Sequence, residues 1–122
     1  MVINCDTLVN LNFNEFYNFH KKNNSHITIV TANKDTIIPY GVCDINKSGK
    51  VHSFNEKPKI NYLANIGLYI INKKLIKQIP KNKKFNMDEL ISIALKKKYK
   101  VSAYPILDSQ WVDTGQLNIF KS

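Results

Sequence analysis

Apolar and polar residues follow two different periods along this chain, which predicts both strands and helices. Residues 26–32, HITIVTA, alternate and are rich in β-branched side chains, so they predict a strand. Residues 37–45 and 51–57, joined by the turn NKSGK, predict a β-hairpin. Residues 64–72, ANIGLYIIN, form an almost continuous apolar run, which is typical of a strand covered on both faces.

Helices are predicted where apolar residues recur every three or four positions. Residues 11–24 place one apolar face along a helix, and we expect the following side chains on it to lie in the core: Leu11, Phe13, Phe16, Tyr17 and Phe19. A short helix is expected over 73–79 and a final one over 114–121.

A further helix is expected after Asn86, which can cap its start. Asp88 and Glu89 fall in its first turn, where carboxylates complement the positive end of the helix dipole. We interpret this pair as a helix-start feature.

Three more strands complete the prediction: residues 1–6, expected to be buried, residues 100–106, and the short segment 109–113. Strands thus alternate with helices and include a hairpin. This order predicts an α/β fold, with helices flanking a mixed β-sheet. A sheet of this kind leaves an edge uncovered, and self-association through that edge is an expectation.

The composition is that of a globular domain or part of one, with 122 residues, 43% hydrophobic and 22% charged. No apolar run approaches the roughly 18 residues that span a bilayer, and the first ten residues lack a basic leader. We therefore expect a cytoplasmic protein that binds no membrane. Cys5 and Cys43 have no CxxC spacing, and we expect them to be buried thiols.

All 18 basic residues are lysines, against 9 carboxylates, which gives a formal charge of +9. Such a charge favours anionic partners such as phosphates. It does not predict nucleic-acid binding, because the chain has no arginine and its lysine clusters fall at predicted helix ends or loops. We interpret these lysines mainly as a solvated surface.

Four short motifs occur in order along the chain: INCD at 3–6, YGV at 40–42 leading to EKP at 56–58, NIGLYI at 65–70 and WVDTG at 111–115. Together they resemble the sugar-1-phosphate nucleotidyltransferases, in particular enzymes of the mannose-1-phosphate guanylyltransferase and glucose-1-phosphate thymidylyltransferase kind. The resemblance covers essentially the whole chain and implies a Rossmann-like nucleotidyltransferase fold that is incomplete here.

The resemblance implies a metal site made by two carboxylates. Asp6 and Asp113 match the family's metal-binding aspartates, although Cys5 stands where the family usually has glycine. Both would hold one Mg²⁺, which prefers oxygen ligands and retains several waters. Together with Lys57, they are the catalytic residues that the resemblance implies.

The same resemblance implies a substrate-binding group around EKP. Lys57 would hold the phosphate of a sugar 1-phosphate, and Glu56 would accept hydrogen bonds from sugar hydroxyls. Pro58 would turn the chain so that both side chains face one pocket. Gly41 would let the backbone approach the sugar, and Asn65 would contact its hydroxyls.

The family's glycine-rich loop, which cradles the nucleotide phosphates, has no counterpart among the four glycines of this chain. We therefore expect residues 1–122 to form the C-terminal, sugar-phosphate-binding part of a nucleotidyltransferase domain, inactive by itself. The parent enzyme would use an NTP and a sugar 1-phosphate. The NIGLYI and NMDEL segments favour a guanylyltransferase, although neither base nor sugar is fixed.

Simpler readings of the same residues stay open. Asp6 and Asp113 are also typical of strand ends that accept backbone N–H bonds. Glu56 and Lys57 are also typical of a solvated turn, and Asn65 of a structural position before a buried strand. The alternative function is a non-catalytic module that binds sugar phosphates or regulates an enzyme.

Overall fold

The structure is a computed structural model, and it describes residues 1–115. The elements, in chain order, are β1 (Val2–Ile3), β2 (Thr7–Val9), α1 (Phe13–Lys22), β3 (Ile27–Ile37), β4 (Gly41–Ile45), β5 (Val51–Glu56), β6 (Lys59–Ile71), α2 (Lys73–Ile76), α3 (Met87–Lys96), β7 (Val101–Ile106), the 3-10 turn Asp108–Gln110 and β8 (Trp111–Asp113). The helix predicted over 114–121 lies almost wholly outside the described residues.

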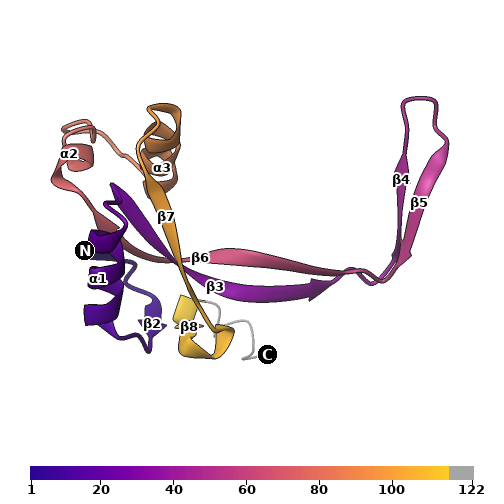
Figure 1. The fold of residues 1–122 in the computed structure, drawn as a ribbon, viewed down its shortest axis with the longest axis horizontal. Coiled ribbons are helices and arrows are strands. Elements are labelled where there is room, and N and C mark those ends of the chain that lie inside the picture. Colours follow the sequence, from indigo (N-terminus) through magenta and orange to yellow (C-terminus); the bar gives the residue numbers. More distant parts are fainter. Residues whose placement is uncertain (116–122) are drawn as a thin grey trace.

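A four-stranded sheet in the order β1-β6-β3-β7 forms the body of the molecule. β3 runs antiparallel to β6 and parallel to β7, while β1 runs antiparallel to β6. Helix α1 packs on one side of this sheet, and α2 and α3 pack on the other (Figure 1). The predicted α/β class with a mixed sheet is therefore confirmed.

The alternation of β3 explains the two layers of core. Val30 and Ala32 face α1, whereas Ile27 and Ile29 face α2 and α3, because successive side chains of a strand point to opposite faces. Residues 66–70 of β6 are all buried, as predicted for a strand covered on both faces.

Each face of the sheet has its own hydrophobic cluster. The cluster under α1 consists of Phe16, Val30, Ala32, Ile66, Leu68, Ile70 and Ile106. The cluster under α2 and α3 consists of Ile27, Leu75, Leu90 and Ala94, with partly buried apolar side chains around it. No helix in the described part of the chain is long and apolar enough to cross a membrane.

The predicted helices differ in how well their bounds agree with the structure. Helix α3 begins after Asn86, whose backbone N–H donates to Glu89 Oε1 at 3.2 Å, so the helix-start interpretation is confirmed. Helix α2 is shorter than the predicted 73–79, because the chain turns after Ile76.

The prediction that all the aromatic residues of α1 lie in the core is wrong. Phe16 is fully buried, but Phe13 and Tyr17 are 44% and 52% exposed, and Phe19 is half-buried. The sheet contacts the side of α1 that carries Phe16 and His20, four residues apart. The apolar stripe of this helix is therefore wider than the surface that the sheet covers.

Two further burial predictions are wrong. Val2 and Ile3 are 43% and 46% exposed, because β1 has two residues and lies at the edge of the sheet. Cys5 and Cys43 are both exposed thiols. Cys5 lies in the turn after β1, and Cys43 lies in β4, outside the sheet that forms the core.

The pairing of β3 with β6 continues beyond the core. Its register runs from Ala32 opposite Ala64 to Ile37 opposite Lys59, so both strands are longer than predicted. The predicted hairpin is confirmed as β4 and β5, and it stands at the far end of this two-stranded ribbon (Figure 1).

We expect Phe16→Ala to lower the free energy of unfolding by about 3–5 kcal/mol, because it leaves a cavity in the cluster under α1. The control is Phe13→Ala on the same helix, whose exposed ring should cost far less. Urea unfolding of both variants measures this. Equal losses would contradict the assignment of the core.

A second prediction concerns His20, whose imidazole is buried and lies 2.7 Å from Thr28 Oγ1 through Nδ1. Burial, aided by the N-terminal amine and His26, lowers the pKa of His20 below its usual 6.5. The unfolded chain then binds this proton more readily than the folded one. The contribution of neutral His20 to the free energy of unfolding is therefore complete above pH 6.5. It is lost as the pH falls through the lowered pKa.

Urea unfolding between pH 8 and pH 5 should show this loss in the wild type and a smaller loss in His20→Gln. His52→Gln, which changes an exposed histidine of the hairpin, should keep the wild-type profile. Identical pH profiles for wild type and His20→Gln would refute the assignment.

Candidate functional site

The short ladder between β2 and β8 brings Asp6 and Asp113 together from opposite ends of the chain. Asp113 ends β8 and stands opposite Thr7, the residue that follows Asp6. Thr114 donates from its backbone N–H and its hydroxyl to the carbonyl of Asp6, at 2.9 and 3.0 Å. The two segments that carry the predicted metal ligands are thus joined directly.

The two carboxylates face the same point beside Gly115. A Cβ placed on Gly115 would lie 3.1 Å from Asp6 Oδ2 and 3.2 Å from Asp113 Oδ1. The backbone N–H of Gly115 also donates to Asp113 Oδ1 at 3.0 Å, which fixes the direction of that carboxylate. Two carboxylate oxygens converging on one point are suited to a hard cation such as Mg²⁺.

An irregularity in β6 holds the turn that carries Asp6. The register of β6 against β3 shifts next to Gly67, whose φ of +79° favours glycine. There the carbonyl of Gly67 accepts from the Asn4 N–H at 2.9 Å, and the carbonyl of Ile66 accepts from the Thr7 hydroxyl at 3.0 Å. The turn from Asn4 to Thr7 is therefore docked on this part of the buried strand.

Asn65 takes part in the same irregularity. Its Oδ1 accepts from the Gly67 N–H at 2.9 Å, and its Nδ2 donates to the Tyr69 hydroxyl at 2.8 Å. Both ends of the amide thus have protein partners, as the structural reading of this residue requires. Its contact with a sugar stays a prediction.

Lys34 supports the site from β3, a role that no local pattern of the sequence predicts. Its ammonium lies 2.7 Å from Asp108 and 5.2 Å from the centre of the Trp111 ring. Trp111 Nε1 donates to the same Asp108 oxygen at 3.0 Å. The Lys34 ammonium, and then the Trp111 N–H, hold the pKa of Asp108 below its usual value. These contacts connect β3 with the start of β8.

Three of the four predicted sugar-phosphate-binding residues lie at the base of the hairpin, and the fourth, Asn65, does not. Gly41 pairs with Glu56, and a Cβ on Gly41 would lie 2.9 Å from Glu56 Oε2 and 2.5 Å from the Phe54 ring. Lys57 has a φ of +45°, and its N–H donates to the Tyr40 carbonyl at 3.2 Å. The structure therefore brings Gly41, Glu56 and Lys57 together, on an exposed surface.

This hairpin group lies apart from the aspartate pair. Strand β6 begins at Lys59, beside the hairpin, and reaches Ile66, where Thr7 is bound, only seven residues later. At about 3.3 Å per residue this separates the two groups by roughly 23 Å. Figure 1 shows the hairpin and β8 at different ends of the ribbon. In this conformation the predicted site residues thus form two groups.

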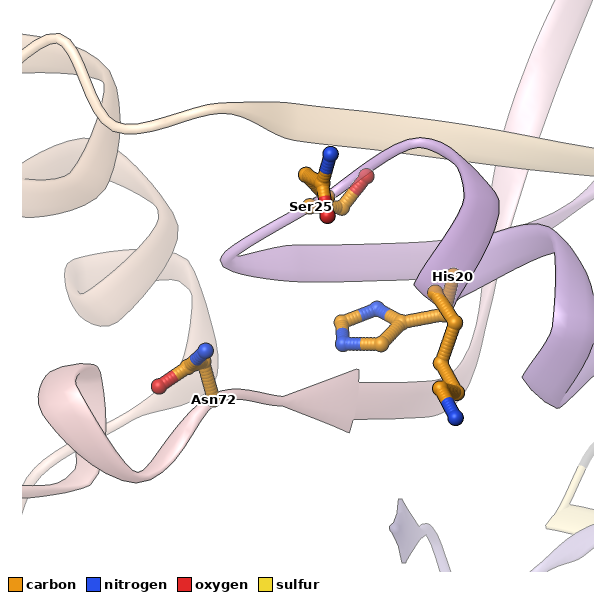
Figure 2. A pocket seen from close by; sticks show the side chains of 5 residues that line it. His20, Ser25 and Asn72 are labelled. Carbon is orange, nitrogen blue, oxygen red and sulfur yellow. The ribbon is translucent and has the colours of Figure 1, made fainter.

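Two surface hollows lie outside the hairpin. One, of about 310 Å³, follows the β2–β8 ladder and is lined by Leu8, Val9, Asn10, Ser109, Gln110, Trp111 and Val112. The other, of about 270 Å³, is lined by His20, Lys21, Asn24, Ser25 and Asn72, none of which was a predicted site residue. Figure 2 shows the His20 imidazole extending toward Asn72 in this hollow.

Comparison with known sequences identifies the family. The sequence model described as nucleotidyl transferase matches residues 1–121. The chain belongs to the nucleotidyl transferase family. The predicted relation to the sugar-1-phosphate enzymes of this family is confirmed by its curated relatives.

A glucose-1-phosphate adenylyltransferase of Mycoplasma mobile is 29% identical over 98% of this chain. A mannose-1-phosphate guanyltransferase of Saccharomyces cerevisiae is 33% identical over 99% of it. In both cases the chain spans 34% of the relative's length, about a third.

The solved structure of HddC from Yersinia pseudotuberculosis resembles this chain with a TM-score of 0.59 and 27% sequence identity. The match covers 93% of this chain and 48% of that one. A second structure of HddC, complexed with GMP-PN, matches with a TM-score of 0.56 and 26% identity. The predicted nucleotidyltransferase fold is therefore confirmed.

The docking of Asn4 on Gly67 gives a third prediction. Gly67 and Gly49 both have positive φ, so alanine at either position costs about 1–2 kcal/mol in backbone strain. A Cβ on Gly67 would also collide with the Asn4 side chain, whereas nothing lies within 4 Å of a Cβ on Gly49. We expect Gly67→Ala to be clearly more destabilising than Gly49→Ala in urea unfolding.

Hydrogen exchange then shows where Gly67→Ala acts. The amide of Asn4, which is bonded to Gly67, should exchange faster in this variant and at the wild-type rate in Gly49→Ala. Unchanged protection of Asn4 in Gly67→Ala would contradict the proposed docking.

Proposed function

We propose that this chain forms the sugar-phosphate-binding part of a nucleotidyltransferase. The parent enzyme transfers a nucleotidyl group from an NTP to a sugar 1-phosphate, giving an NDP-sugar and pyrophosphate. The convergence of Asp6 and Asp113 beside Gly115 carries this proposal. The activities named for the curated relatives, on glucose 1-phosphate and mannose 1-phosphate, support the substrate class.

Asp6 and Asp113 are the residues that would hold Mg²⁺. Their two oxygens face one point, and both are the hard ligands that this ion prefers. When bound there, the ion supplies positive charge that offsets the charge on the reacting phosphates.

The residues at the hairpin base would bind the sugar 1-phosphate. Lys57 offers a positive charge to the phosphate, and Glu56 accepts hydrogen bonds from the hydroxyls. Gly41 would offer its backbone beside Glu56. Asn65 lies in β6 beside the Asp6 turn, so it would contact the same sugar only if the two groups came together. A phosphate oxygen of the sugar attacks the nucleotide α-phosphorus in line and expels pyrophosphate. Positioning and charge suffice for this reaction, and no protein nucleophile is needed.

The separation of the two groups supports the proposal that the chain is inactive by itself. One substrate phosphate cannot contact both Lys57 and the aspartate pair across roughly 23 Å of strand. The chain also has no glycine-rich loop for nucleotide phosphates, since its four glycines lie far apart. The same two observations favour the alternative function, a module that binds sugar phosphates without catalysis.

Pyrophosphate release tests this function with a panel of NTPs and sugar 1-phosphates. We expect none from the 122-residue chain, and metal-dependent release from the protein extended through any upstream reading frame. In the extended protein Lys57→Ala should lower kcat/KM about tenfold or more, because it removes a charged contact. Lys59→Ala is the control, since Lys59 is paired with Asp35 on the neighbouring strand β3 of the ribbon.

Release by the 122-residue chain would refute its proposed inactivity. Equal effects of Lys57→Ala and Lys59→Ala would refute the assigned role of Lys57. If the extended protein releases no pyrophosphate but binds a sugar 1-phosphate, the non-catalytic alternative holds.

A further inference from the structure

We propose that Thr114 and Gly115 are positioning residues that keep the Asp6 and Asp113 carboxylates at the separation at which one divalent cation fits. This inference rests on the proposed function, because it takes those two aspartates as the metal ligands. Neither residue is assigned as a ligand itself. Thr114 and Gly115 instead set how far apart the Asp6 and Asp113 carboxylates lie and in which direction each one points.

Thr114 joins the two segments that carry the aspartates. Its N–H and its hydroxyl both donate to the carbonyl of Asp6, 108 positions away in sequence, at 2.9 and 3.0 Å. A carbonyl oxygen has two lone pairs, so it accepts both bonds together. This paired contact extends the three-residue ladder of β2 and β8 at the end where the aspartates lie.

Gly115 keeps the space between the carboxylates open. A Cβ at this position would lie 3.1 Å from Asp6 Oδ2 and 3.2 Å from Asp113 Oδ1, tighter than ordinary van der Waals contact. A methyl group would therefore displace a carboxylate or fill the space where the cation is bound.

The backbone of Gly115 makes alanine a precise probe of that space. Its φ is not in the left-handed region, so alanine can adopt the same conformation. Its N–H, which donates to Asp113 Oδ1, is kept in the variant. Gly115→Ala thus changes the space between the carboxylates and leaves the hydrogen bonds of the backbone in place.

The test uses Mn²⁺ as the probe and the 122-residue chain as the protein. Free Mn²⁺ is followed by electron paramagnetic resonance during titration, and circular dichroism melts follow the fold. We expect Gly115→Ala and Thr114→Val to raise the Kd for Mn²⁺ about tenfold or more, as is usual for residues that orient metal ligands. Thr114→Ser keeps the hydroxyl and should restore the wild-type Kd, which a loss of packing would not predict.

Asp6→Asn and Asp113→Asn separate this inference from the proposed function. If both abolish binding while Gly115→Ala and Thr114→Val bind as the wild type does, the positioning role is wrong and the metal site stands. If the wild type binds no Mn²⁺, or the asparagine variants bind it equally well, the metal site fails and the inference fails with it. If Gly115→Ala melts well below the wild type, its Kd no longer tests the inference. The Kd values of Thr114→Val and Thr114→Ser then decide whether the positioning role holds.

Discussion

The antiparallel pairing of β3 with β6 is the interaction on which the rest of this structure depends. At one end the two strands are buried between α1 and the pair α2 and α3, and they supply residues to both hydrophobic clusters. At the other end they leave the body and carry the β4–β5 hairpin. Between these ends, the shift of register at Gly67 exposes the carbonyls on which the Asp6 turn is docked. The core, the hairpin and the Asp6–Asp113 pair are thus all placed by one strand pair.

Local sequence pattern predicted the parts of the fold that are decided locally. The alternation of 26–32 and the apolar run of 64–72 reflect burial on one sheet, and the capping residues around Asn86 reflect the start of α3. The exposure of Phe13, Tyr17 and Cys43 was not predictable in this way. It depends on how much surface the partner element covers, which spacing along one helix or strand does not contain. For the same reason the length of the ribbon was missed, because each strand beyond the core is stabilised by the other.

The candidate site likewise combines residues that local sequence motifs predict with contacts that depend on the fold. Asp6, Asp113, Glu56 and Lys57 were found because their motifs resemble a family, and the structure brings them together within two groups. The hydrogen bonds of Thr114 and the ion pair of Lys34 join segments distant in sequence, and no local pattern marks them. Asn65 is informative here, since one amide serves the irregular turn of β6 at both ends. Asn65, which its motif presents as a sugar ligand, therefore also supports the part of β6 on which the Asp6 turn is docked.

The two-stranded part of β3 and β6 also has a mechanical consequence. A ribbon of two strands twists more strongly than a wide sheet, and it has no third strand to resist a change of twist. The hairpin stands at its end, so the ribbon acts as a lever arm, and a small rotation near Ala32 and Ala64 becomes a large displacement at Glu56 and Lys57. The distance between Lys57 and the Asp6–Asp113 pair therefore depends on the torsional stiffness of this ribbon, and a surface that packs against the ribbon would change that distance.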